Sequence, residues 1–135
     1  MSGDRSDAQR LLAKEVDALV QRLRLWTPAR WAAAADPWGT RADLCRHLAQ
    51  WLADRAAARE GEPQRFLPVL QPDLLVADQL AVTGDDLVRT GPDDETCKAA
   101  VDHLLAHRLD LLGEDVPASL GGDEALARGR AVCAA

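Results

Sequence analysis

Apolar residues recur at intervals of three and four in four long segments of the chain, the spacing that gathers them on one face of a helix. These segments are 6–26, 40–59, 72–88 and 93–113. None alternates apolar and polar residues over the length of a half-buried strand. Four amphipathic helices bury their apolar faces most simply against one another. The sequence therefore predicts an all-α fold, an antiparallel four-helix bundle.

The helix ends carry signals of their own. Ser6 and Thr40 each stand three residues before a side chain that can complete a capping box. Thr27 precedes a proline suited to the first turn of a short extra helix over 29–35. The segment 61–71 contains two prolines, which exclude a regular helix and make it the longest connection between helices.

The length of 135 residues predicts a single domain, 1–135, with its core within about 6–113 and a loop and short helix over 114–135. The net charge of −6 repels phosphate backbones, so we expect no nucleic-acid partner. The polar N-terminus and the lack of a long apolar run predict neither a signal peptide nor a membrane partner. We expect a cytoplasmic protein, and the abundance of Ala, Arg, Leu and Asp with little Lys is typical of a GC-rich bacterial source.

The cysteines are Cys45, Cys97 and Cys133, an odd number without the close spacing of a disulfide framework. On a regular helix Cys45 is turned roughly 200° away from His47, so the two cannot face one metal. We interpret all three cysteines as small, reduced hydrophobic residues.

The histidines are the most informative polar residues. His103 and His107 stand about one helical turn apart and share a face, while His47 lies on another predicted helix. A pair with this spacing can hold a metal, and a third imidazole from a facing helix would complete a catalytic zinc site with one open position. The alternative is a pair of solvated or hydrogen-bonded histidines and a satisfied His47 in the core.

Two motifs surround these histidines. The segment 38–48 reads WGTRADLCRHL and resembles the motif W-T-x-x-D-x-x-x-H-L, and 103–110 reads HLLAHRLD and resembles [EH]-x-x-x-H-R-W-D. These are motifs of the DinB-like four-helix metalloproteins, in the branch of the mycothiol-dependent maleylpyruvate isomerases. The resemblance covers about 11–114. It implies that the three histidines are the ligands of a metal, usually zinc.

The chain departs from those motifs at Gly39, an insertion, and at Leu109, which replaces a tryptophan. The maleylpyruvate isomerases also carry a further C-terminal domain. We therefore expect the 135-residue chain not to isomerise maleylpyruvate efficiently.

Three carboxylates are candidates for acid–base or supporting roles. Asp110 follows His107 by three residues and could orient it or act as a general base, although a solvated helix-end carboxylate has the same pattern. Asp78 has apolar neighbours three and four residues away, so it is either a site residue or a boundary residue facing solvent. Asp43 is either a helix cap or a hydrogen-bond partner of His47.

Trp51 lies one turn after His47 and could wall a cofactor pocket, whereas core packing is the default for the other tryptophans. Arg108, with Arg41 and Arg46, flanks the histidine motifs and could bind a cofactor or a carboxylate-bearing substrate; surface ion pairs are the alternative.

The resemblance implies a zinc-dependent enzyme that transfers or adds a low-molecular-weight thiol such as mycothiol to a small-molecule substrate. Asp110 and Asp78 are the predicted proton-transfer residues. A hydrolytic enzyme would use the same ligands. The alternative from another class is a non-catalytic helical bundle that binds a partner, with vestigial or structural histidines. A homodimer is compatible with either interpretation.

Overall fold

The computed structural model describes residues 4–112, and these form an all-helical fold, as the sequence predicts. Four long helices and one short helix follow one another along the chain. They are α1 (Asp7–Leu23), α2 (Pro28–Ala32), α3 (Arg41–Glu60), α4 (Leu75–Arg89) and α5 (Asp94–Leu112). The predicted loop and short helix over 114–135 and the interpretation of Cys133 concern residues outside the described ones.

The predicted helix caps are confirmed. Ser6 and Thr40 each accept a hydrogen bond from the third helical N–H at 3.1 Å and complete a capping box. Thr27 caps α2 in the same way, with proline in the first turn. α4 begins at Leu75 without a side-chain cap, later than the predicted start at 72, because the turn at 72–74 is tightened by shorter-range backbone hydrogen bonds.

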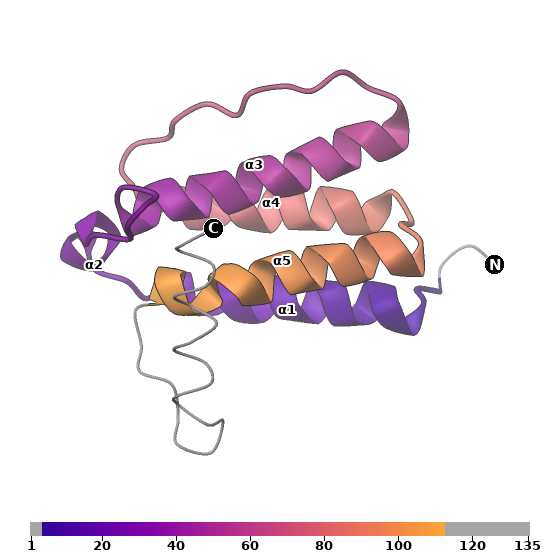
Figure 1. The fold of residues 1–135 in the computed structure, drawn as a ribbon, viewed down its shortest axis with the longest axis horizontal. Helices are drawn as coiled ribbons and strands as arrows, with labels where there is room; N and C mark the ends of the chain where they lie inside the picture. The colour runs from indigo at the N-terminus through magenta and orange to yellow at the C-terminus, as the bar shows by residue number, and fades with distance from the viewer. Residues whose placement is uncertain (1–3, 113–135) are drawn as a thin grey trace, which may run out of the picture.

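The four long helices lie side by side (Figure 1), and α1 and α3 each contact both α4 and α5. The segment 61–74 runs back along α3, so α4 starts at the end of the molecule where α3 starts (Figure 1). Hydrogen bonds fix both ends of this pair. Arg46 near the start of α3 binds Asp73 just before α4, and Arg59 at the end of α3 binds Thr90 just after α4.

α3 and α4 are therefore parallel, and the expectation of an antiparallel arrangement fails for this pair. The reason is the length of their connection. The 20 residues of α3 span about 30 Å at 1.5 Å per residue, and an extended segment such as 61–74 covers that distance easily. α5 returns along α3 in the opposite direction (Figure 1), which places the middle of α5 beside the first half of α3.

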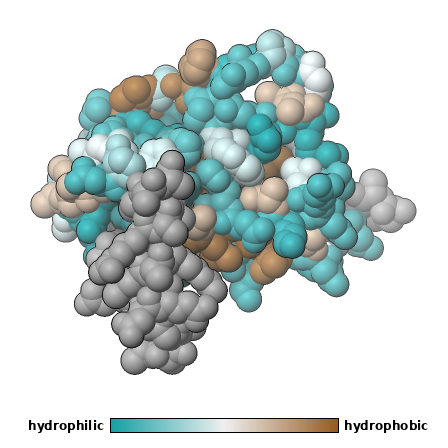
Figure 2. All heavy atoms as spheres, viewed as in Figure 1, coloured by the Kyte–Doolittle hydropathy of each residue, from teal (hydrophilic) through white to brown (hydrophobic). Residues whose placement is uncertain are grey.

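The apolar faces meet in a single core that includes the predicted stripes of α1 and α3. Leu105 is 46% exposed, since it lies at the edge of the apolar stripe of α5 whose centre is formed by Leu104 and Val101. The face shown in Figure 2 is mostly hydrophilic, with separate hydrophobic patches. Among the described residues, no helix has both the length and the apolar character needed to cross a membrane.

Candidate metal centre

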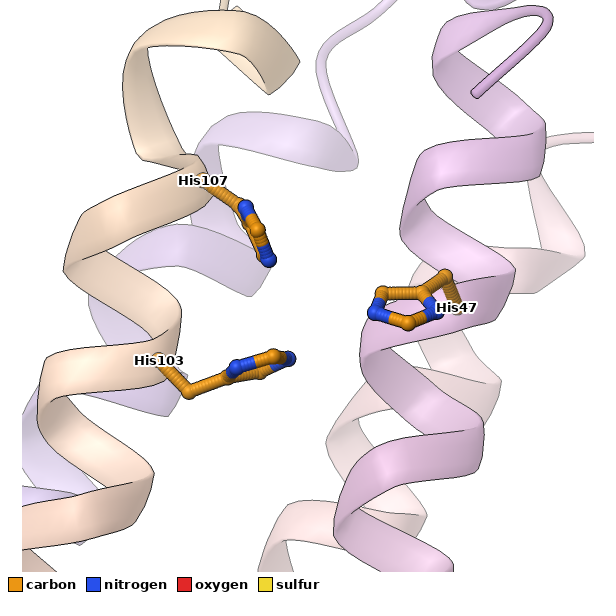
Figure 3. Close-up of side chains that lie close together, drawn as sticks. All are labelled: His47, His103 and His107. Carbon is orange, nitrogen blue, oxygen red and sulfur yellow. The ribbon is translucent and has the colours of Figure 1, made fainter. Parts of the chain in front are cut away.

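Three histidines from two helices converge on one point. His103 and His107 project from α5 and His47 projects from α3 into the space between these helices (Figure 3). One ring nitrogen from each lies within 4.8 Å of the others. Nitrogen ligands of tetrahedral zinc, with bonds of about 2.0–2.1 Å, lie about 3.3 Å apart, so small side-chain rotations bring the three nitrogens to one ion. The residues present fit a metal, and their predicted convergence is confirmed.

The two helices contribute to this geometry in different ways. The one-turn spacing of His103 and His107 puts their ring centroids 4.6 Å apart in an edge-on arrangement. His47 reaches the pair only because α3 packs against α5, which brings its ring centroid to 5.6 Å from that of His103 and 5.7 Å from that of His107. The site is thus assembled by a tertiary contact.

Two tryptophans hold the histidine rings. The Trp51 ring is stacked on His103, with centroids 4.4 Å apart and planes 13° apart. The Trp38 ring centroid lies 4.4 Å from that of His47 and 5.2 Å from that of His107, so Trp38 contacts histidines from both helices. The expectation for Trp51 as a wall is therefore consistent with its position. Trp38, for which core packing was the default, also belongs to the site.

A tight turn before α3 sets the position of Trp38. The turn is closed by hydrogen bonds from Ala35 N to Gly39 O at 2.8 Å and from Arg41 N to Ala33 O at 2.9 Å. Gly39 has φ 109°, a conformation that other residues rarely adopt, and a Cβ there would lie 2.5 Å from Asp43 Oδ2. In the sequence, only the position of Trp38 at the start of the motif that contains His47 points to a role in the site. Its contact with His107 depends on this turn and could not be predicted from the motif.

The ring nitrogens of the site are short of hydrogen bonds. His103 Nε2 and His107 Nδ1 are buried, and neither has a partner among the described residues. Most buried polar atoms in proteins are hydrogen-bonded, because an unpaired one costs about 1–3 kcal/mol. An ion bound between the three rings would supply partners to nitrogens of this kind.

Burial keeps the imidazoles neutral. Desolvation lowers the pKa of His47 and His107, and the charge of Asp110 acts in the opposite direction on His107. Desolvation, with repulsion from the other two histidines and from Arg55, lowers the pKa of His103 to about 4. At pH 7 all three rings are therefore in the neutral form that binds metal ions.

The other predicted site residues divide into two groups. Asp110 lies close enough to His107 to affect its pKa and stays beside the cluster. Asp78 is 58% exposed and pairs with Arg24 of α1 at 3.0 Å, so the structure gives it a partner on another side of the fold. Arg108 lies 3.9 Å from Glu15 of α1.

Asp43 caps α3, the simpler of its two predicted roles. Its carboxylate accepts a hydrogen bond from Thr40 N at 3.0 Å and pairs with Arg46 at 3.1 Å. The backbone hydrogen bond from Thr40 is the main reason that the pKa of Asp43 is lowered. No contact with His47 is needed to explain this residue.

The cysteines of the described residues behave as hydrophobic side chains. Cys45 and Cys97 are buried free thiols within the core. Burial raises the pKa of Cys45 to about 12, so its thiol stays protonated. Neither cysteine belongs to the histidine cluster.

Comparisons with protein-family models, with curated proteins and with solved structures find no match to this chain.

Proposed function

We propose that this protein is a metal-dependent enzyme of low-molecular-weight thiol chemistry, with the metal held by His47, His103 and His107. The convergence of the three ring nitrogens within 4.8 Å is the observation that carries the proposal. Three neutral imidazoles with no further protein ligand among the described residues are the donor set of an open catalytic zinc site. A structural zinc site normally has four protein ligands, so this donor set favours catalysis.

The thiol chemistry rests on the resemblance of the two histidine motifs to those of the mycothiol-dependent enzymes. The arrangement of the helices agrees with a DinB-like four-helix bundle, which we include in the proposal. Each of α1 and α3 packs against α4 and α5, and the two motifs lie on the facing helices α3 and α5. Bundles commonly build metal sites from side chains on facing helices.

In the proposed reaction, different residues have different roles. His47, His103 and His107 would hold the zinc, whose positive charge would lower the pKa of a thiol bound there and favour its thiolate form at neutral pH. Trp38 and Trp51 pack on the imidazoles, limit their rotation and exclude water from one side of them. We assign to Asp110, whose charge acts on His107, the role of accepting or returning a proton at its Oδ during the reaction.

The proposal is tested first by elemental analysis of protein purified without a histidine tag. We expect one equivalent of zinc per chain. Thermal unfolding with candidate thiols, including mycothiol, should then show stabilisation of the zinc-loaded protein only. A protein that takes up no metal, and whose stability zinc does not change, would be a binding module.

Turnover distinguishes the remaining alternatives. Thiol-dependent consumption of an electrophile supports the thiol transferase, whereas consumption without thiol supports a hydrolase with the same ligands. Maleylpyruvate with mycothiol is the direct assay of the isomerase reaction.

A further inference from the structure

A positively charged side chain lies near the histidine cluster, on the surface of the helix that carries His47. Arg55 is exposed on α3, one turn after Trp51 and two turns after His47. Its guanidinium carbon lies 5.3 Å from the centroid of the Trp51 ring, and that ring is stacked on His103 with centroids 4.4 Å apart. A chain of two ring contacts therefore connects this cation to a metal ligand.

The arginines nearer to the histidines in sequence are engaged elsewhere. Arg46 binds two aspartates, one of them Asp73 at 2.9 Å. Arg108 lies 3.9 Å from Glu15. Arg41 lies over the ring of Trp26, which packs on Trp31 and contacts no histidine ring.

Arg55 differs from Arg46 and Arg108 because, within the described part of the chain, its charge has no ion-pair partner. Among residues 4–112, no carboxylate lies within ion-pair distance of its guanidinium group. The adjacent Asp54 accepts hydrogen bonds from Gln50 at 2.8 Å and from Gln64 at 3.1 Å. Because Trp51 supports the planar group, the guanidinium keeps its hydrogen-bonding edge available to a ligand.

We propose that Arg55 binds the carboxylate of a small anionic substrate whose reacting end lies at the histidine cluster. This inference rests on the proposed function and narrows its electrophile to a carboxylate-bearing molecule. A guanidinium group donates two parallel N–H bonds to a carboxylate, which fixes both the position and the direction of the ligand. The overall charge of −6 does not oppose this binding strongly, since its field is screened beyond about 8–10 Å at physiological salt.

The test measures binding of succinate to the zinc-loaded protein by isothermal titration calorimetry, with uncharged succinamide as the matched ligand. Arg55→Gln should weaken succinate binding about tenfold, and Arg55→Lys about threefold, because lysine keeps the charge without the fork. Arg89→Gln removes another exposed arginine, the partner of Asp85 on α4, and should leave binding unchanged. Succinamide should not distinguish the variants.

Zinc content is measured in every sample, which separates this inference from the proposed function. If all variants hold zinc and Arg55→Gln binds succinate as the wild type does, Arg55 is not the anion site although the metal centre stands. If the zinc-loaded wild type binds no succinate, Arg55 is likewise not an anion site, and the metal centre is unaffected by that result. If the protein takes up no zinc, the proposed function fails, and the same titration of wild type and Arg55→Gln without metal decides on Arg55 alone.

Discussion

The interface between α1 and α4 and the interface between α3 and α5 lie on opposite sides of the fold. They contain different kinds of side chains. Between α1 and α4, Gly84 lets the helices approach so closely that a Cβ at this position would lie 2.6 Å from Val16 Cγ1. Between α3 and α5, imidazole and indole rings fill the space, and two buried imidazole nitrogens have no partner in the described chain.

The comparison separates stability from function within one small domain. The α1–α4 interface gains its energy from close apolar packing, which tolerates little change in volume. The α3–α5 interface leaves polar atoms unsatisfied, which is unfavourable unless a ligand satisfies them. Substitutions in the α1–α4 interface should therefore change the free energy of unfolding, whereas substitutions in the α3–α5 interface should change zinc affinity.

The largest effect is expected from loss of a metal ligand. His103→Ala should lower zinc affinity by more than about 100-fold, since even residues that only support ligands contribute 10- to 100-fold. Competition with a chromophoric chelator measures the affinity, and circular dichroism should show unchanged helix content. Asp78→Ala, on α4, is the matched control and should bind zinc normally. Wild-type affinity in His103→Ala would show that the ligand set is wrong, and unfolding would show that the site is structural.

On the other side, Gly84→Ala should destabilise the protein by about 1–2 kcal/mol. The added methyl group overpacks the interface with Val16, which outweighs the helix propensity gained from alanine. Urea denaturation measures the change, and zinc affinity should not move. In the double variant Gly84→Ala with Val16→Ala, the clash is absent, so the cost of the glycine substitution should disappear. A cost that persists would mean that close approach is not the reason for this glycine.

An intermediate effect is expected at Trp38, which contacts ligands from both helices. Trp38→Leu should weaken zinc binding about tenfold, because His47 and His107 lose the ring that restricts their rotation. The control is Trp26→Leu, since Trp26 packs edge-on against Trp31 with centroids 4.9 Å apart and touches no histidine ring. Equal zinc affinity in the two variants would contradict a positioning role for Trp38.

The smallest effect concerns pH. The pKa of His103 falls from 6.5 to about 4 on folding, so the unfolded chain binds more protons than the folded one between these values. The metal-free protein should therefore keep its full stability above pH 6.5 and lose on the order of 1 kcal/mol as the pH falls toward 4, allowing for partial exposure of the ring. Urea denaturation of wild type and His103→Gln at pH 7 and 5 measures the difference. An equal loss in both would assign the pH dependence to other groups.

Much of this protein was determined by its sequence, because the responsible interactions are local. Ser6 and Thr40 cap helices through atoms three residues away, and the one-turn spacing of His103 and His107 places both rings on one face of α5. The odd number of cysteines and the lack of close spacing between them likewise indicated reduced thiols, and Cys45 and Cys97 are free thiols in the structure.

Only the tertiary structure decided how these local pieces meet. The long connection 61–74 makes α3 and α4 parallel and leaves α5 to return along α3, which carries His47 to the histidine pair. Asp78 has a helical neighbourhood that matches a buried site residue, yet Arg24, 54 positions away, binds it in solvent. Spacing along a helix defines which residues share a face, whereas the partner of that face depends on loop paths and packing between helices distant in sequence.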